Sequence, residues 1–325
     1  ALNLVVRTFL VKILDPLVNV QICLAKSLEI MELGFLFALM HLAILQFPSG
    51  AIGWGKHGHY ITCKISEAYM KEEALAAVKK LLPDSASSDL ANVCSWADDI
   101  RFHYRWSSAL HYIDTPDFAC SYNYARDCHD EAGRVNRCVA GAIYNYTNQL
   151  SSEHQTSIIH SNHNLSEAIM FLSHFIGDIH QPLHVGFAGD AGGNTVIVRW
   201  YRRKTNLHHV WDTMIIDEAL KRFYHSDIHV MIASIQYNIT GGWSEEFPLW
   251  EKCKENDVAC PNEYAYESVK LACKSAYKNA SPGSILKDDY FLTRLPVVEK
   301  RLAEGGVRLA SLLNRIFSSP QIAKS

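Results

Sequence analysis

The chain has 325 residues, of which 48% are apolar and 20% are charged, and its formal net charge is −3. This length and composition suit one large globular domain and exclude a fibrous, low-complexity or disordered protein. The slightly acidic balance also excludes a protein that attracts nucleic acid through a bulk positive charge, so any such binding would need a local basic patch or bound cations.

An uncharged apolar run near the N-terminus predicts a signal peptide. Residues 34–47 (GFLFALMHLAILQF) are too short for a membrane span, and small residues follow them at 48–53. We interpret residues 31–53 as the signal peptide, residues 1–30 as upstream sequence that is an artefact of the gene prediction, and residues 54–325 as a single domain. The alternative is an internal anchor helix. We expect no membrane contact of the mature form.

The cysteines and glycosylation sequons indicate the secretory pathway, with an extracellular or vacuolar destination. Nine cysteines occur, and Cys23 precedes the predicted cleavage point. The others imply four disulfides, for which the sequence alone allows 105 pairings, and lie at Cys63, Cys94, Cys120, Cys128, Cys138, Cys253, Cys260 and Cys273. The sequons are at Asn145, Asn164, Asn238 and Asn279.

Helical periodicity dominates the rest of the chain. It predicts a helical segment within 54–82, ended by Pro83, and a helix over about 165–181, ended by Pro182. Residues 195–201 (TVIVRWY) are β-branched and aromatic and predict the one clear strand, and a last helix is expected over 296–317. The predicted fold is mainly α with a small β element.

Histidines and aspartates recur at helical spacing. His174 and Asp178 are four residues apart and share one helix face, His184 follows Pro182, and His208 and Asp212 repeat the spacing. One such pair would more simply be a hydrogen-bonded or solvated pair. Two pairs, without a serine nucleophile motif, a P-loop or a dinucleotide motif, indicate a metal site, and mixed imidazole and carboxylate ligands suit zinc.

Two further groupings complete the set of candidate ligands. Asp98 lies in SWADDIRF with His111 shortly after it in LHYID, and His59 lies in WGKHGH at the predicted mature N-terminus. Neighbouring residues are expected to support the ligands or to lie at the surface, namely His180, His209 and Asp99.

These motifs resemble those of the S1/P1 nucleases, in particular the plant bifunctional nucleases. From Trp54 to about Phe317 the chain carries, in the family's order, WGKHGH, SWADDIRF, LHYIDTPD, FLSHFIGDIHQPLHVGF, GGNTVIVRWYRRKTNLHHVWD and RLPVVEKRLAEGGVRLASLLNRIF. The resemblance implies the helical phospholipase C/P1 nuclease fold. It also implies a zinc-dependent endonuclease that cleaves single-stranded RNA and DNA to 5′-phosphates, with 3′-nucleotidase activity. We expect a monomer.

The resemblance further implies three zinc ions. One would bind Asp98, His111, His174 and Asp178; a second would bind His184, His208 and Asp212; a third would bind His59, Asp178 as a bridge, and the amino nitrogen and carbonyl oxygen of Trp54. Several divalent cations suit phosphodiester hydrolysis because they stabilise the attacking and leaving oxygens. The expected catalytic residues are Asp98, Asp114 and Asp178.

Three residues are candidates for substrate binding, each with a simpler alternative. Tyr112 offers a stacking platform for a base, or is a core tyrosine. Asp114 contacts a base edge or the attacking water, or caps the turn before Pro116. Asn194 binds a phosphate or orients Asp178, or is a turn residue.

A basic run before His208 has two interpretations. Arg199, Arg202, Arg203 and Lys204 alternate with aromatic residues and could form a nucleic-acid patch, but a solvated hairpin tip is the preferred interpretation.

We also predict two disulfide pairings. Cys63 is expected to pair with Cys94, which would link the first helix to SWADD, and Cys128 with Cys138 in a short loop.

Two other functions remain open at this stage. A zinc phospholipase C shares the fold and the ligand set that the resemblance implies, although the motifs outside the ligands favour a nuclease. A secreted binding protein stabilised by metal would require a disrupted ligand set, whereas all nine positions are filled.

Overall fold

The computed structural model describes residues 53–156, 164–253 and 257–318. The predicted upstream segment and the predicted signal peptide, apart from Gly53, lie outside these residues. The described residues belong to one compact unit. None of their helices has both the length and the hydrophobicity that crossing a membrane requires.

The described chain is mainly α, as predicted. Its α-helices are α2 (Lys56–Tyr69), α3 (Glu72–Leu81), α4 (Trp96–Ile100), α5 (Tyr124–Asp127), α6 (Val139–Thr156), α7 (Leu165–His180), α8 (Leu207–His209), α9 (Ile215–Phe223), α10 (Ile228–Thr240), α11 (Phe247–Trp250), α12 (Pro261–Leu271) and α13 (Asp288–Phe317). Short 3₁₀ segments include η3 (Arg105–His111) and η4 (Pro182–His184), and η6 (Val210–Met214) is one turn of π-helix.

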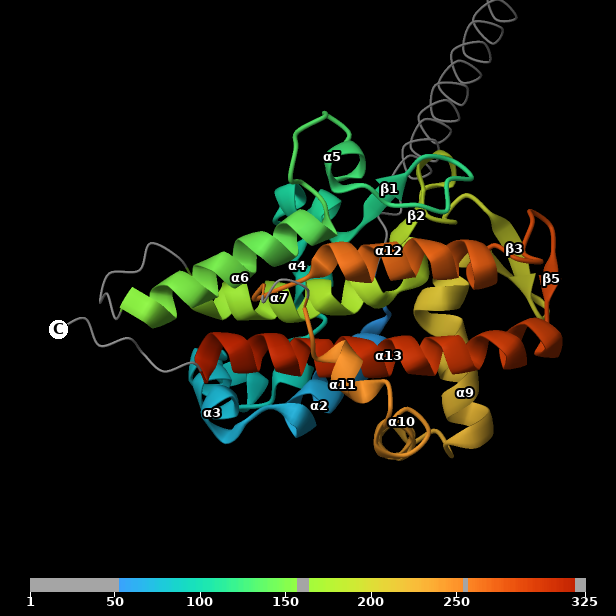
Figure 1. Ribbon diagram of the computed structural model, residues 1–325. Coiled ribbons are helices and arrows are strands. Elements are labelled where there is room, and N and C mark those ends of the chain that lie inside the picture. The colour runs from blue at the N-terminus through green and yellow to red at the C-terminus, as the bar shows by residue number, and fades with distance from the viewer. Residues whose placement is uncertain (1–52, 157–163, 254–256, 319–325) are drawn as a thin grey trace, which may run out of the picture. The chain divides into compact units, whose positions relative to one another are not determined.

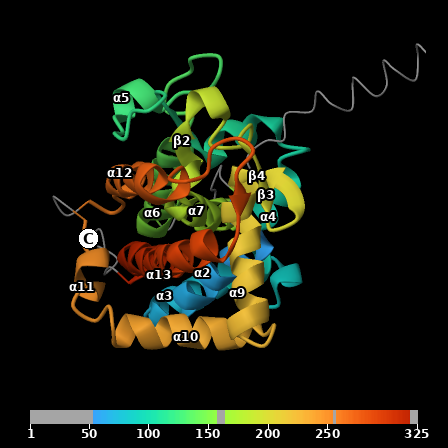
Figure 2. The ribbon, with the colours of Figure 1, turned by 90° about the vertical axis from the view of Figure 1, so that its right-hand side faces the viewer.

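Helix α7 lies at the centre of the helical packing. Every residue from Ala168 to His180 is buried. Helices α6 and α13 both pack against α7, and α2 packs along α13 on the other side (Figure 1). Figure 2, turned by 90°, shows α10 crossing below α13. Polar side chains that α7 carries are therefore held in a rigid, water-poor interior.

Two small sheets complete the fold. Strands β1 (Ile113–Thr115) and β2 (Val185–Phe187) pair in parallel, with Ile113 opposite Val185. Strands β3 (Ile197–Trp200), β4 (Arg203–Asn206) and β5 (Ile285–Leu286) form the second sheet in the order β4-β3-β5, and β3 confirms the predicted strand. Because β1 follows His111 and β2 follows His184, the first sheet brings two candidate ligands together.

The predicted first helix is two helices. The chain is extended at Met70 and Lys71, between α2 and α3. The side chain of Asn314, in α13, accepts a hydrogen bond of 2.7 Å from the Lys71 amide and donates one of 3.2 Å to the Tyr69 carbonyl. A residue 243 positions away in the sequence therefore caps both helix ends at the break.

The last helix begins earlier than predicted. Helix α13 starts at Asp288 and contains Pro296, which the sequence analysis took as its first residue. Proline has no amide hydrogen for the carbonyl four residues earlier, that of Leu292. Leu292 is exposed, so water can bond to this carbonyl, and burial of the following residues against α2 and α7 maintains the helix.

Four disulfides connect the described cysteines. Both predicted pairs are present, Cys63–Cys94 and Cys128–Cys138, together with Cys120–Cys273 and Cys253–Cys260. The sequon residues lie at the surface: Asn145, Asn164 and Asn279 are exposed and Asn238 is half-buried. Both features are compatible with folding in an oxidising compartment.

Candidate metal centre

The structure brings the eight side chains of the predicted ligand set into three groups, two of which share His174. The groups are His59 with His174 and Asp178, Asp98 with His111 and His174, and His184 with His208 and Asp212. Within each group, the potential ligand atoms lie within 4.8 Å of one another. Helix α7 supplies His174 and Asp178, and the other donors come from α2, α4, η3, η4, α8 and η6.

Asp178 lies between residues of all three groups. Its Oδ2 lies 3.0 Å from His111 Nδ1 and 3.1 Å from His174 Nε2. Its Oδ1 lies 3.3 Å from His59 Nε2 and 3.8 Å from His184 Nδ1. One buried carboxylate thus faces four imidazoles from different segments.

Backbone carbonyls determine how three of the imidazole rings are protonated. The Nδ1 atoms of His174, His184 and His208 lie 2.8, 2.6 and 2.7 Å from the carbonyls of Cys94, His111 and Gly192. A carbonyl only accepts, so each Nδ1 carries a hydrogen, and each ring, when neutral, presents its Nε2 lone pair to the centre. This is the orientation that a metal-ligating histidine needs.

Two of these lone pairs face each other. The Nε2 atoms of His184 and His208 are 3.1 Å apart, and His208 Nε2 is 3.2 Å from Asp212 Oδ2. Two neutral rings would repel in this arrangement unless one gains a proton or a cation lies beside both. The donor set therefore fits a bound cation.

Several polar atoms of the centre have no hydrogen bond, although buried polar groups in proteins nearly always have one. Among the described residues these include both ring nitrogens of His59, Nε2 of His111, and one carboxylate oxygen each of Asp98 and Asp178. Desolvation without a partner costs about 1–3 kcal/mol per group, and more for charged groups. Coordination of cations would offset this cost.

The pKa values in the centre diverge. Burial raises the pKa of Asp212 well above its usual range. A hydrogen bond from Gln181 lowers this pKa, but the negative charges of Asp98 and Asp178 raise it further. Burial and the charge of His174 lower the pKa of His59 to about 4. Burial would also lower the pKa of His174, but Asp178 and Asp98 outweigh it and raise this pKa to about 9. Bound cations would resolve this divergence, because metal ligands must be deprotonated: the carboxylates would be ionised and the imidazoles neutral at the same pH.

The main chain before α2 runs into the same centre. Trp54 is fully buried, and the Gly55 amide donates to the Asp212 carbonyl at 2.8 Å. A Cβ atom at Gly53 would lie 1.6 Å from Asp178 Oδ1 and 2.7 Å from His59 Nε2. The backbone at Gly53 and Trp54 is therefore adjacent to the group from which the third zinc site was predicted.

The predicted substrate residues lie in two places. Tyr112 and Asp114 are both half-buried; Tyr112 directly follows His111, and Asp114 is the middle residue of β1. Burial, then the charge of Glu131, raises the pKa of Asp114 to about 6. Asn194 lies in the loop before β3, where its side-chain amide donates 2.9 Å to the Ala191 carbonyl, which is a turn interaction.

Two residues of the centre were missed by the sequence analysis. Gln181 Nε2 donates to Asp212 Oδ1, and its Oε1 accepts from the Leu183 amide. The guanidinium of Arg101 is nearly buried, and its charge opposes the raised pKa of Asp212. Arg101 lies in SWADDIRF and Gln181 in FLSHFIGDIHQPLHVGF, so their positions inside motifs that carry candidate ligands could have indicated a role at the centre.

The neighbouring residues differ in their surroundings. His180 is buried away from the donors, with Nδ1 donating to the Ile176 carbonyl and Nε2 near Arg308. Asp99 forms an exposed ion pair with Lys56 at 3.7 Å, and His209 is half-buried.

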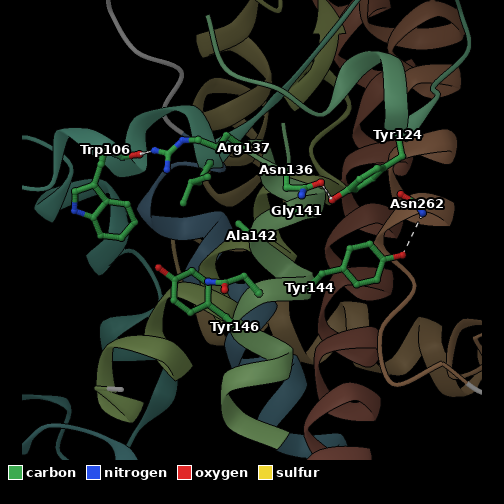
Figure 3. Close-up of a pocket in the computed structure, with 11 residues that line it drawn as sticks. Trp106, Tyr124, Asn136, Arg137, Gly141, Ala142, Tyr144, Tyr146 and Asn262 are labelled. Atoms are coloured by element: carbon green, nitrogen blue, oxygen red, sulfur yellow. Dashed lines mark hydrogen bonds between the residues drawn. The ribbon is translucent and has the colours of Figure 1, made fainter. Parts of the chain in front are cut away.

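A large groove lies outside the metal centre. It has a volume of about 740 Å³ and includes no candidate ligand in its lining. Aromatic side chains flank it, with Trp106 and Tyr146 at one end and Tyr124 and Tyr144 at the other (Figure 3). Arg137 donates to the Trp106 carbonyl, and Tyr124 donates to Asn136 at 2.9 Å.

Comparisons with known proteins agree with this geometry. The family model for S1/P1 Nuclease matches residues 54–318. The chain belongs to the S1/P1 nuclease family. It is 63% identical over 282 residues to Endonuclease 4 of Arabidopsis thaliana, an alignment that covers 86% of this chain and 94% of that protein. It is 54% identical to Endonuclease 5 of the same plant over 288 residues, which are 87% and 97% of the two chains.

The match extends to fungi. Nuclease P1 of Penicillium citrinum is 32% identical over 282 residues, which cover 83% of this chain and all of that protein. Together these matches identify a plant-type S1/P1 endonuclease, an enzyme that cleaves phosphodiester bonds. The sequence left two enzyme classes open, and these matches favour the nuclease over the phospholipase C.

Proposed function

We propose that this S1/P1 nuclease is a zinc-dependent endonuclease that hydrolyses single-stranded RNA and DNA to 5′-phosphate products and also acts as a 3′-nucleotidase. We further propose that it matures in the secretory pathway and acts as a monomer outside the cell or in the vacuole. The observation that carries the proposal is the set of three neighbouring donor groups, in which backbone carbonyls orient three of the imidazoles.

Zinc is the proposed metal because of the donor types. The groups contain imidazole and carboxylate donors, and the described cysteines are engaged in disulfides. Imidazole and carboxylate in small, mixed sets suit zinc, whereas magnesium and calcium favour oxygen ligands alone.

Nine residues would hold three zinc ions. Asp98, His111, His174 and Asp178 would hold the first, His184, His208 and Asp212 the second, and His59, Asp178 and the main chain of Trp54 the third. When bound, zinc lowers the pKa of water to about 7 and stabilises negative charge on phosphate oxygens.

The residues around the donors would position the substrate. Arg101 is the nearly buried cation beside Asp212 and would bind a non-bridging phosphate oxygen. Gln181 would hold Asp212 in place. Asp98 and Asp178 would keep their negative charge directed at the cations throughout the reaction.

Preference for single strands has a physical basis in Tyr112 and Asp114. A base must leave its stack before an aromatic ring can hold it, and such stacking is worth about 1–3 kcal/mol per base. Tyr112 would supply the ring and Asp114 would accept hydrogen bonds from the base edge. For Asn194, the observed turn interaction supports a role in shaping the loop whose Gly192 carbonyl orients His208.

The test is an assay on single- and double-stranded RNA and DNA, with and without a chelator. We expect cleavage of single strands to 5′-phosphate products, weak cleavage of duplexes, loss of activity with chelator, and recovery with zinc. Hydrolysis of phosphatidylcholine but not of nucleic acid would overturn the proposal. Persistence of full activity after demonstrated metal removal would overturn its zinc component.

A further inference from the structure

Four cations gather on the β3–β4 hairpin. Arg199 lies on β3, Arg202 in the turn, and Arg203 and Lys204 on β4, and we call these four residues the hairpin cations. All four are exposed. Within the part of the chain that the structure describes, no carboxylate forms an ion pair with any of them. They stand out because the whole protein has a net charge of −3.

Two of the hairpin cations lie directly opposite each other. Arg199 is the antiparallel partner of Lys204, and paired residues project from the same face of a sheet. Val198 and Trp200 point into the core, so Arg199 and Lys204 share the solvent face. Like charges in directly opposed positions destabilise a hairpin. An arrangement that costs stability and has no carboxylate partner among the described residues indicates an anionic partner elsewhere.

The turn that carries these residues is held in place. Tyr201 has a positive φ of 53°, and its hydroxyl donates to Asp288 at 2.6 Å. Arg222 donates both to the Tyr201 hydroxyl at 2.9 Å and to Asp288 at 2.6 Å. The Asp288 carboxylate is thus engaged by Tyr201 and Arg222, and these bonds hold the turn of the hairpin in place.

The hairpin leads directly into the metal centre. Strand β4 ends at Asn206, whose Oδ1 accepts the His209 amide at 2.7 Å and so caps α8, the helix that carries His208. Lys204 precedes His208 by four residues, so an extended chain places them at most about 13 Å apart. Figure 2 shows β3 and β4 side by side.

We propose that the hairpin cations bind the phosphate backbone of a single strand a few nucleotides from the bond that is cut. This inference rests on the proposed nuclease function and adds a subsite that only substrates longer than a dinucleotide can reach. Its chemistry is charge attraction to successive phosphates, which makes it independent of base sequence and sensitive to salt.

The experiment compares a long single-stranded DNA with a dinucleotide at several salt concentrations. The test variant is Arg199→Gln/Lys204→Gln. The matched control is Lys79→Gln/Lys80→Gln, which removes two exposed cations from α3, and Arg199→Lys preserves the charge. Each lost phosphate contact should reduce the slope of log kcat/KM against log salt by about 0.7, so the double variant should be flatter by about 1.4 on the long strand.

On the dinucleotide, we expect kcat/KM of the double variant to equal that of the wild type. Unchanged salt dependence on the long strand, or an equal loss on both substrates, would overturn the subsite. A wild-type enzyme that cleaves neither substrate would instead overturn the proposed function. Removal of like charges should not lower the Tm. If the Tm of the double variant falls, the single variant Lys204→Gln replaces it in the experiment. Its slope of log kcat/KM against log salt should change by about 0.7.

Discussion

Nε of Arg301, in α13, donates a hydrogen bond of 3.0 Å to the carbonyl oxygen of His180, the last residue of α7. The same guanidinium pairs with Glu267 at 2.8 Å and with Glu304, and its side chain is only 2% exposed. Arg301 therefore holds the end of the helix that carries Asp178, directly before the turn that carries His184.

The first prediction concerns this residue. Arg301→Met keeps an unbranched apolar stem but removes the guanidinium, which leaves the His180 carbonyl and the buried Glu304 without their partner. Breaking a buried pair in this way costs about 3–5 kcal/mol. We expect a lower Tm and a lower zinc content. The control is Lys300→Met, whose pair with Glu246 is partly exposed and should be worth less than about 1 kcal/mol. Equal melting of the two variants would contradict the role of Arg301.

The second prediction concerns acid stability. Burial alone would raise the pKa of Glu267, but Arg301 and Arg308 outweigh it and lower this pKa to about 2, from an ordinary value of 4.5. A carboxyl whose pKa is depressed on folding stabilises the protein above its unfolded pKa, and this stability is lost as the pH falls through the folded pKa. Glu267→Gln should therefore be less stable than the wild type at neutral pH, with the difference shrinking between pH 4.5 and about 2. Denaturant unfolding at several pH values measures it, and a difference independent of pH would count against this account.

The third prediction compares two carboxylates. Asp178→Asn should lose more zinc and more activity than Asp212→Asn, because Asp178 lies near four imidazoles whereas Asp212 lies near two, those of His184 and His208. An amide retains the shape but not the charge that neutralises two cations. Metal analysis and activity of both purified variants test it. Equal zinc content and activity would refute the bridging role.

The fourth prediction is that the metal also stabilises the fold. The donors come from seven separate elements between α2 and η6, so ions that bind them connect distant segments, and ligand binding of this kind contributes folding energy. Chelation should lower the Tm as well as abolish activity, and zinc should restore both. A Tm that stays constant through complete metal removal, verified by metal analysis, is the contrary result.

The fifth prediction concerns processing between Gly53 and Trp54. An amide nitrogen cannot coordinate zinc as a free amine does, because its lone pair is delocalised. Gly53 also lies against Asp178 Oδ1, in space that an ion at the third site would need. A protein with one extra residue before Trp54 should bind less zinc and act more slowly, while Trp54→Phe with correct processing should keep its metals. Three zinc ions and full activity in the extended protein would disprove this.

The clustering of the candidate donors was predictable because part of its signal is local. His174 with Asp178 and His208 with Asp212 are four residues apart, and helical geometry alone places each pair on one face. The resemblance then supplied the remaining donors from short motifs. Gln181 and Arg101 were missed because neither spacing nor residue type distinguishes them from surface residues, and only the folded structure shows what they contact.

Helix boundaries were less predictable where distant residues determine them. The break after Tyr69 is capped by Asn314, which no window around residue 70 contains. The sequence predicted the start of α13 at Pro296, a residue type that is common in the first turn of a helix, yet this helix begins at Asp288. In both cases tertiary contacts outweighed a correct local rule.

The position of α13 in the chain also affects the order in which the enzyme is assembled. Asp212 is the last of the proposed ligands in the sequence. The helix that holds the end of α7 comes later, at Asp288–Phe317. At a synthesis rate of about 5–20 residues per second, the ribosome completes the ligand set roughly 5–20 s before it completes α13. The nascent chain therefore displays its donors before it can hold them in register. We therefore expect metal capture to become stable only after α13 has packed against α7, which would place activation late in folding.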